Sequence, residues 1–355
     1  MYGSERALLD LLPPLRTTWD VAICCPEGPF AVATARMGAL VFPSFTGLLH
    51  EKGKGAWLRA ALNLRKVIKA LAPDLIHVNQ AGATRITFLA AGHKIPVVAH
   101  VRIYEDFAYL RARRLDERVR AVVCVSGSMK EEASRTIRPE KLFRLYDPYQ
   151  RSFRDEERTP SANLVLCVGR LAKIKGQDLL LDALANLRSR GREVTCRFLG
   201  GDATGGIYME ELRSRTGARG LEGQVEWLGV AQDVFPELAR AQAVVVPSER
   251  EPLGRVIFEA WDAGTVPIVW RGSGGAAEAI LASEGGILFE ERTTASLADS
   301  IMRALELPDR ERDSLVQKGR SWLEANCSPT RVAEDMDGIW KSCIASKRHE
   351  SLARE

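Results

Sequence analysis

Two glutamates with seven residues between them, Glu251 and Glu259, are the acids best placed to do chemistry in this sequence. They frame the position, near Gly254, where a polar loop gives way to apolar residues at helical spacing. The N-terminus of a helix presents unpaired N–H groups and a partial positive charge, which suits a phosphate group. Carboxylates instead accept hydrogen bonds from hydroxyl groups. The combination predicts a ligand that is both phosphorylated and rich in hydroxyls.

The residues before this helix predict a buried strand that ends in a sharp loop. Residues 244–246, all valine, suit a parallel strand that is buried on both faces, and Pro247 and Pro252 exclude a helix before Gly254. A side chain at Gly254 would obstruct the approach of the backbone to a phosphate. Because open α/β sheets bind ligands at the carboxyl ends of their strands, we expect the loop to line a binding site.

A second loop carries two cations after another apolar strand. The sequence LVLCVGRLAKIKGQ, residues 164–177, places Gly169, Arg170 and Lys175 between a strand and a helix. Fixed cations can stabilise the negative charge that develops on a leaving diphosphate. We predict this role for Arg170 and Lys175, although the loop taken by itself could equally be a solvated turn with two basic residues.

These segments resemble the retaining GT-B glycosyltransferases, and family four in particular. The spacing of Glu251 and Glu259 matches the family's E-x7-E signature, and VGRLAKIKG resembles its V-G-R-L-x-x-x-K-G segment. A later Gly-Gly-x-x-Glu turn of the family is similar to Gly274, Gly275 and Glu278. The resemblance implies that a sugar is transferred from a nucleotide diphosphate sugar to an acceptor hydroxyl, with retention at the anomeric carbon.

The resemblance also implies roles for individual residues. Glu251 would contact the hydroxyls of the transferred sugar, and Glu259 the ribose diol of the nucleotide. His100, at the end of a predicted strand, matches a position where many family members carry a histidine near the reacting sugar. The implied catalytic set is Glu251, His100, Arg170 and Lys175. The implied donor-binding set is Gly169, Arg170, Lys175, Gly200, Gly201, Val230, Glu251, Leu253, Gly254, Arg255 and Glu259.

Contacts with the acceptor are expected from the first half of the chain. Asn79 and Gln80 lie at the end of one predicted strand and Ser126 lies at the end of another, where the resemblance implies acceptor contacts. Structural roles are the alternative for several candidates: His100 could be a core residue, and Glu259 could be a surface acid of its helix. The context of the complete motif favours the functional interpretation.

Alternating strand and helix patterns predict two Rossmann-like α/β units with parallel sheets, in a GT-B arrangement. We expect an acceptor-side domain over residues 1–155 and a nucleotide-sugar-binding domain over 156–334, joined by a polar linker. The last helix, about 335–355, is expected to cross back onto the first domain, as in family members. The predicted strands are Trp19–Cys24, Ala39–Phe42, Asp74–Asn79, Pro96–Val101 and Ala121–Ser126, then Leu164–Val168, Val194–Leu199, Gln224–Leu228, Ala243–Val246, Val266–Trp270 and Gly285–Phe289.

The beginning of the sequence departs from the family. Family members usually open with a strand and a glycine turn before the helix that here begins YGSERALLDLL. The expected fold is therefore GT-B with the first strand of the N-terminal domain missing. Its loss would cost about 1–3 kcal/mol for each buried backbone group left unpaired. We hypothesise that the true start lies roughly 15–20 residues upstream, and upstream coding sequence without an apolar strand would contradict this.

Composition excludes several other classes of protein. No apolar run reaches the roughly 18 residues of a transmembrane helix and no signal peptide is evident, so we expect a cytoplasmic protein. The seven cysteines contain no C-x-x-C pair, which predicts reduced core residues. The run FLGGD lacks the G-x-G-x-x-G spacing of a nicotinamide-binding turn.

No metal or other cofactor is expected. Asp335 and Asp337 form a D-x-D, but they fall in the polar phase of a helical pattern around Val332. No cluster of histidines and cysteines offers ligands, so Arg170 and Lys175 would replace a divalent ion. The donor substrate would be a UDP-, GDP- or ADP-linked sugar.

Charge is distributed unevenly along the chain. Residues 1–150 hold 22 Lys and Arg against 14 Asp and Glu, a net of +8. The helix predicted over Ala56–Leu71 suits either a core helix with a solvated face or peripheral docking on anionic lipid at the inner face of the membrane. Its apolar side is expected to comprise Trp57, Leu58, Ala61, Leu62, Val67, Ile68 and Leu71. Nucleic acid is excluded as a partner because the basic half offers no aromatic stacking platform.

Two alternative functions stay open. The chain could carry another GT-B activity, such as that of a sugar-nucleotide epimerase or phosphorylase, or it could bind a nucleotide sugar without turning it over. The resemblance favours glycan, polysaccharide or glycolipid synthesis. The base, the sugar and the acceptor depend on loops that vary within the fold.

Overall fold

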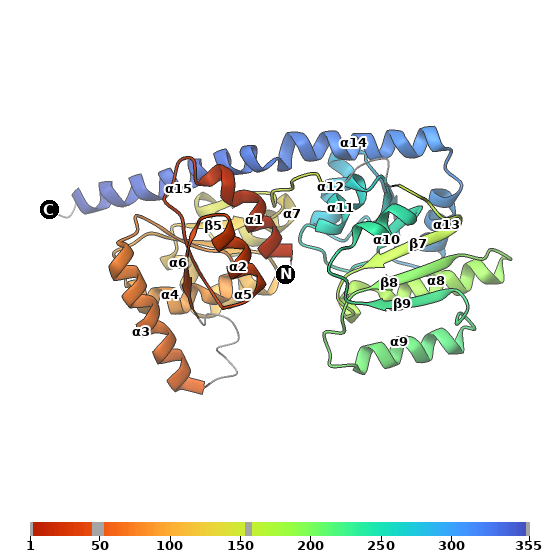
Figure 1. The fold of residues 1–355 in the computed structure, drawn as a ribbon, viewed down its shortest axis with the longest axis horizontal. Helices are drawn as coiled ribbons and strands as arrows, with labels where there is room; N and C mark the ends of the chain where they lie inside the picture. Colours follow the sequence, from red (N-terminus) through yellow and green to blue (C-terminus); the bar gives the residue numbers. More distant parts are fainter. Residues whose placement is uncertain (1–2, 45–52, 153–157, 353–355) are drawn as a thin grey trace. The chain divides into compact units, whose positions relative to one another are not determined.

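The computed structural model describes residues 3–44, 53–152 and 158–352, and the chain divides into two compact units (Figure 1). The first unit comprises Met1–Gln150 and Asn326–Glu355, and the second comprises Arg151–Ala325. The boundary thus lies between residues 150 and 151 instead of the predicted 155 and 156. The C-terminal segment joins the first unit from residue 326 rather than from about 335.

The second unit is built on a parallel sheet with the strand order β12-β11-β10-β7-β8-β9. Its strands are β7 Leu164–Val168, β8 Thr195–Leu199, β9 Val225–Gly229, β10 Ala243–Val246, β11 Val266–Trp270 and β12 Ile287–Phe289. Its helices are α8 Gln177–Ser189, α9 Ile207–Ala218, α10 Phe235–Arg240, α11 Arg255–Asp262, α12 Gly275–Ser283, α13 Thr294–Leu305 and α14 Asp309–Cys327. The chain order reverses at the β7/β10 pair, which is the point where open α/β sheets bind ligands.

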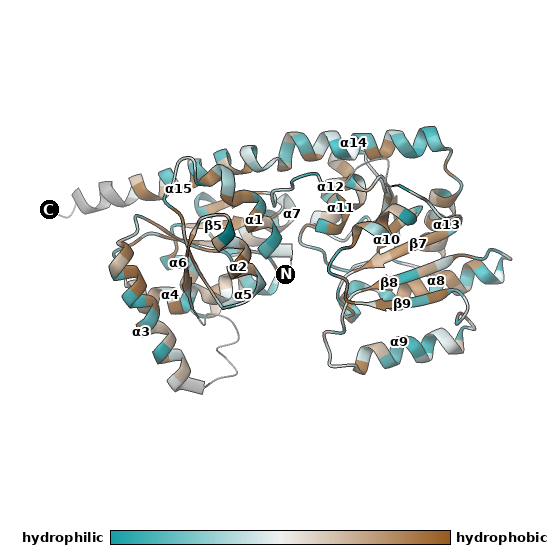
Figure 2. Cartoon of the chain, viewed as in Figure 1, coloured by the Kyte–Doolittle hydropathy of each residue, from teal (hydrophilic) through white to brown (hydrophobic). Residues whose placement is uncertain are grey.

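The central strands of this sheet are buried on both faces. Along β7, Val165 and Cys167 join an apolar cluster with α8 and α13, whereas Leu164 and Leu166 join a second cluster with α10 and α11. Successive side chains of a strand point to opposite faces, so a run of apolar residues fills both layers. Figure 2 shows the apolar strands between helices whose outer faces are hydrophilic.

The first unit contains two parallel sheets in its described residues. The first pairs β1 Ala22–Cys25 with β2 Leu40–Pro43, and the second has the order β3-β4-β5-β6. The strands of the second sheet are β3 Ile76–Val78, β4 Val97–Val101, β5 Ala121–Cys124 and β6 Leu142–Arg144, of which β6 was not predicted. The helices are α1 Gly3–Leu15, α2 Pro29–Arg36, α3 Gly53–Leu71, α4 Thr84–Ala91, α5 Glu105–Ala112, α6 Leu115–Arg118, α7 Gly127–Ser134 and α15 Pro329–Leu352.

Helix α15 packs beside α1 on the sheet of the first unit (Figure 1). Leu11 and Leu15 of α1 share an apolar cluster with Val98, Val123 and Met336, the last of which lies on α15. The predicted return of the last helix to the first unit is therefore observed. Asp335 and Asp337 also lie on α15, where they pair with Arg331 and Lys341 one helical turn away.

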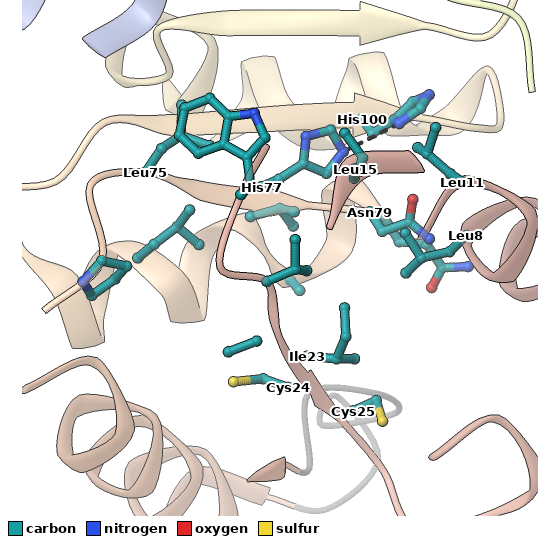
Figure 3. A pocket seen from close by; sticks show the side chains of 18 of the residues that line it. Leu8, Leu11, Leu15, Ile23, Cys24, Cys25, Leu75, His77, Asn79 and His100 are labelled. Carbon is teal, nitrogen blue, oxygen red and sulfur yellow. Dashed lines mark hydrogen bonds between the residues drawn. The ribbon is translucent and has the colours of Figure 1, made fainter. Parts of the chain in front are cut away.

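A break separates the two sheets of the first unit. Within the described residues, β1 pairs with β2 and β3 pairs with β4, so each has an edge that faces no strand. A cavity of about 1420 Å³ lies between these edges. Figure 3 shows Ile23 and Cys24 on one side of it and Leu75 and His77 on the other.

Helix α3 buries only part of its predicted apolar side. Ala60 and Ala61 are buried with Ile86 of α4, whereas Leu58 and Leu62 are 62% and 50% exposed. The reason is that α3 packs closely on α4 through its small residues, which turns the two leucines outward. Among the described residues, no helix is long and apolar enough to cross a membrane. All seven cysteines are free, as predicted, and six of them are buried.

Candidate functional site

The carboxyl ends of β7, β8 and β9 form a turn that only glycine fits. Gly200 follows β8 with φ +156°, and a Cβ there would lie 1.9 Å from the carbonyl oxygen of Gly169. Its N–H donates to the oxygen of Gly229 at 2.7 Å, and the N–H of Gly169 donates to that of Leu199 at 2.9 Å. A Cβ at Gly201 would meet Val230 at 2.9 Å. The loops therefore approach one another too closely for a side chain at Gly200 or Gly201.

Lys175 and Glu251 form an ion pair at the neighbouring strand end. Nζ of Lys175 lies 2.6 Å from Oε2 of Glu251, and Oγ of Ser248 donates to the same oxygen at 3.1 Å. The two charged side chains are 22% and 13% exposed, so they are partly shielded from water but open to a ligand. An ammonium carries three N–H groups, and two of those on Lys175 are not used by this pair.

The loops that carry this pair are locked together by backbone contacts. Gly176 has φ +72°, and a Cβ there would lie 2.4 Å from the carbonyl oxygen of Pro247. The N–H of Glu249 donates to the oxygen of Ile174 at 2.8 Å. Nε2 of Gln177 donates to the oxygen of Arg170 at 3.0 Å. The cation of one loop and the acid of the other are thus held by two strands of one rigid sheet.

Helix α11 begins at this edge after a left-handed residue. Gly254 has φ +79° and ψ 59°, and a Cβ there would lie 3.1–3.2 Å from Ile257, Ala276 and Glu251. The N–H of Glu251 donates to the oxygen of Ser273 at 2.6 Å, which ties the loop to the turn before α12. The N-terminus of α11, with its unpaired N–H groups and partial positive charge, therefore begins within four residues of Glu251 in the chain.

The structure brings most of the predicted donor residues to one edge of the second unit. The residues on loops at the carboxyl ends of β7, β8, β9 and β10, or at the start of α11, are Gly169, Arg170, Lys175, Gly200, Gly201, Val230, Glu251, Leu253, Gly254 and Arg255. Arg170 and Val230 are exposed, whereas Leu253 is buried and belongs to the core beneath the loop. Glu259 lies farther along α11 and is 8% exposed.

The predicted acceptor-side residues Asn79 and Ser126, and the predicted catalytic residue His100, lie at the carboxyl ends of neighbouring strands in the first unit. Asn79 follows β3, His100 is the penultimate residue of β4, and Ser126 follows β5. The amide of Asn79 accepts from Nη2 of Arg102 at 2.8 Å. Ser126 is buried and caps α7, because its Oγ accepts from the N–H of Met129 at 3.2 Å. Its hydroxyl therefore has a structural partner already.

A pair of histidines sits at the same end of this sheet. Nε2 of His77 lies 3.3 Å from Nδ1 of His100, and Nε1 of Trp340 donates to Nδ1 of His77 at 3.1 Å. Removal from water, and then the positive charge of Arg102, lower the pKa of His77 to about 3. The same two causes, with His77 as a third, hold the pKa of His100 well below its usual range. Both rings are neutral at physiological pH.

Several residues of these sites were not predicted. Ser248 lies in the predicted loop, directly after Pro247. A hydroxyl at that position could have been predicted to contact the carboxylate of Glu251. His77 lies in a predicted strand, but its pairing with His100 depends on the register of β3 against β4. Trp340 is 263 positions from His77 in the sequence, so no local sequence pattern could predict their contact. Among the described residues, no group of three His, Cys, Asp or Glu could hold a metal ion.

Two family models together match residues 1–322. The model described as Glycosyl transferases group 1 matches residues 149–322, and the one described as Glycosyltransferase Family 4 matches residues 1–148. The boundary between the two matches falls close to the boundary between the two structural units.

Curated relatives point the same way. The chain is 28% identical over 272 residues to the GDP-mannose-dependent alpha-(1-6)-phosphatidylinositol monomannoside mannosyltransferase of Mycobacterium tuberculosis. It is 27% identical over 263 residues to the alpha-D-kanosaminyltransferase of Streptomyces kanamyceticus. Each match covers 69% of this chain and 66% of the relative, so the chain spans about two thirds of the length of these proteins.

Solved structures with the same fold cover nearly the whole chain. Anabaena Alr3699/HepE in complex with UDP and glucose matches with a TM-score of 0.78 at 20% identity, over 96% of each chain. A glycosyltransferase from Rickettsia africae matches with a TM-score of 0.79 at 18% identity, over 96% of this chain and 94% of that one. These likenesses confirm the predicted fold class.

Proposed function

The chain belongs to the group 1 glycosyltransferases of the GT-B fold, and from this premise we propose that it transfers a glycosyl group from a nucleoside diphosphate sugar to an acceptor hydroxyl. The observation that carries the proposal is the pairing of Lys175 with Glu251 beside the glycine turn of Gly169 and Gly200. A cation and exposed backbone suit the diphosphate, and a carboxylate suits the sugar hydroxyls.

The two cations neutralise the leaving group in this proposal. Arg170 is exposed and makes no ion pair within the described residues, and Lys175 keeps two N–H groups beyond its bond to Glu251. Both follow β7, at the switch point of the sheet. Charge that grows on the diphosphate as the glycosidic bond breaks is stabilised most by donors that need no reorganisation. Reaction without a divalent metal follows from this division of roles.

Glu251 positions the donor sugar in this proposal and does not attack it. Its Oε2 already accepts hydrogen bonds from Lys175 and Ser248, which stabilise the ionised carboxylate and make it a weaker nucleophile. The bond from the anomeric carbon to the diphosphate oxygen breaks while the bond to the acceptor oxygen forms on the same face. The acceptor proton passes to the diphosphate, and the configuration is retained.

The donor is a nucleoside diphosphate sugar of undefined base. One solved relative in fold holds UDP with glucose, and one curated relative is named as GDP-mannose-dependent. Glu259, which is buried on α11, is the residue we assign to the ribose diol. By the same likeness we place the reaction in the cytoplasm, in the synthesis of a glycan, a polysaccharide or a glycolipid.

The test is transfer followed by proton NMR. The full chain is incubated with UDP-glucose, GDP-mannose or ADP-glucose, with octyl glucoside or phosphatidylinositol as the acceptor and with no acceptor. We expect one donor to be consumed and an α-linked product to appear from the α-linked donor. A β-linked product would contradict retention. An epimerised nucleotide sugar formed without acceptor would favour the epimerase alternative, and binding without consumption would favour the binding-only alternative.

We further propose that α3 docks on an anionic bilayer. Leu58 and Leu62 are exposed on this helix, and Arg59, Arg65 and Lys66 surround them. A shallow pocket of about 330 Å³ lies on the same helix. It is lined by Arg59, Leu62, Asn63, Arg65, Lys66 and Lys69. Exposed leucines that insert among headgroups, together with cations near the surface, are the features of an interfacial helix.

Vesicle flotation tests the docking. The protein should float with vesicles of phosphatidylcholine and phosphatidylglycerol but not with phosphatidylcholine alone, and added salt should release it. Leu58→Ser with Leu62→Ser should abolish flotation, whereas Ile207→Ser, which changes an exposed residue of α9, should not. The proposal would be contradicted if flotation depended neither on the charge of the lipid nor on Leu58 and Leu62.

A further inference from the structure

Trp340, His77 and His100 form a chain of hydrogen bonds in the first unit. Nε1 of Trp340 lies 3.1 Å from Nδ1 of His77, and Nε2 of His77 lies 3.3 Å from Nδ1 of His100. The ring of His77 meets the other two edge to face, with centroid distances of 5.6 Å and 5.4 Å. Figure 3 shows the two histidine rings joined at the wall of the cavity.

The direction of these bonds is fixed by the first donor. The indole nitrogen of Trp340 can only donate, so Nδ1 of His77 must accept and carries no proton. A neutral imidazole has its proton on the other nitrogen, so Nε2 of His77 donates to Nδ1 of His100. By the same rule, His100 carries its proton on Nε2. A proton on Nδ1 of either histidine would place two N–H groups opposite each other, and that hydrogen bond would be lost.

Burial, together with the charge of the surroundings, keeps both rings neutral. The guanidinium of Arg102 is held by Asn79 and by Asp147, at 2.8 Å and 2.5 Å. The removal of water, and then the positive charge of Arg102, lower the pKa of both histidines. A second proton on either ring would also break a bond of the chain, because it would occupy a nitrogen that now accepts.

The last N–H of the chain has no protein partner. Nε2 of His100 is buried and makes no hydrogen bond within the described residues, and the whole residue is 3% exposed. A buried donor left unpaired costs about 1–3 kcal/mol, so such a group is usually satisfied by a ligand or water. The donor stands next to the end of β4, the edge at which open α/β sheets bind their ligands.

We propose that His77, oriented by Trp340, is a positioning residue that fixes His100 as a hydrogen-bond donor through Nε2 to an oxygen of a substrate bound at the carboxyl edge of this sheet. This inference rests on the proposed function for the identity of that substrate. His100 does not act as a base in the reaction, because Nε2 already holds a proton and Nδ1 is occupied by the bond from His77. His77 and Trp340 act through His100 and do not touch the substrate.

Three variants separate positioning from packing. His77→Leu removes the donor to His100, whereas His77→Gln keeps an amide N–H for His100 and an amide oxygen for Trp340. Trp340→Phe removes the indole N–H but keeps an aromatic ring. Trp19→Phe is the matched control, because Trp19 packs edge to face on Trp340 at 5.4 Å but donates its own N–H to Asp337.

Tautomers are read directly by nitrogen NMR of the full chain labelled at histidine. His77→Gln and His100→Gln assign the two sets of signals. We expect Nδ1 of both residues to be unprotonated and Nε2 to be protonated in the wild type. Trp340→Phe should give mixed tautomers, and Trp19→Phe should not. A wild type in which His100 is protonated at Nδ1, or populates both tautomers, would overturn the inference whether or not the protein transfers sugar.

Kinetics test the consequence for the reaction. With the donor that proves active, kcat should fall about tenfold to a hundredfold in His77→Leu and Trp340→Phe, by analogy with the loss of a partner that orients a metal-binding histidine. His77→Gln and Trp19→Phe should stay within about threefold of the wild type. If Trp340→Phe has mixed tautomers but an unchanged kcat, the positioning role is wrong. The same variant tests the role if His77→Leu does not fold. Absence of transfer by the wild type would count against the proposed function, while the NMR result would still stand or fall on its own.

Discussion

The ammonium of Lys175 lies 2.6 Å from Oε2 of Glu251, although 76 positions separate the two residues in the sequence. One follows β7 and the other follows β10, and these strands are neighbours in the sheet of the second unit. The pair therefore joins the two loops that flank the switch point, and it places a cation and a carboxylate where one ligand can contact both.

Removing the cation of this pair should slow transfer without unfolding the protein. Lys175→Met should lower kcat by about 10²–10³, because a fixed donor to the developing charge is lost. Lys173→Met is the matched control, since Lys173 lies in the same turn but is 74% exposed and pairs with Glu211 at 3.3 Å. Initial rates at saturating donor check both variants. Equal losses in the two would show that Lys175 has no special role.

The glycine turn should tolerate no side chain. Gly200→Ala would set a Cβ 1.9 Å from the oxygen of Gly169 at a φ of +156°, so the backbone of β7 or β8 must shift. We expect a loss of about 1–3 kcal/mol in the free energy of unfolding, which lowers Tm by roughly 2–4 °C for each kcal/mol. Gly223→Ala, where a Cβ meets nothing within 4 Å, should change little. Thermal unfolding measures both, and equal Tm values would contradict the close approach.

Acid should destabilise the first unit through its buried histidine. The pKa of His77 is about 3 in the folded protein and near 6.5 in the unfolded chain. Between these values the unfolded chain binds more protons, so the free energy of unfolding rises with pH and the contribution is complete above about pH 6.5. Going from pH 7 to pH 5 should cost the wild type about 1–2 kcal/mol more than His77→Gln. Urea denaturation at both pH values measures this difference, and parallel losses would show that His77 titrates normally.

Much of the second unit follows from local sequence patterns. Leu164–Val168, Ala243–Val246 and Val266–Trp270 were predicted to the residue, because each is an apolar run between a polar turn and a glycine or proline. Ladder bonds to strands on both sides then enforce the same limits. The loops that hold Lys175 and Glu251 were located for the same reason, whereas their ion pair could not be foreseen from spacing.

The first unit was harder to predict because its elements are short and depend on tertiary contacts. The strand predicted from Trp19 starts only at Ala22, since the N–H of Trp19 bonds to the oxygen of Leu15 and extends the helical turn. The strand β6 has three residues and no clear alternation. Two residues of the predicted apolar side of α3, Leu58 and Leu62, are exposed, because the contact with α4 rather than average hydrophobicity decides which residues face inward.

Nucleotide binding at the edge that holds Lys175 and Glu251 is the central claim, and calorimetric titration with UDP, GDP and ADP tests it most directly. We expect the wild type to bind one of the three selectively, and Lys175→Met and Glu259→Ala each to weaken that binding about tenfold or more. Glu210→Ala, which changes an exposed acid of α9, should bind like the wild type. Binding of none of the three, or binding that neither Lys175→Met nor Glu259→Ala affects, would contradict the assignment of this edge as the donor site.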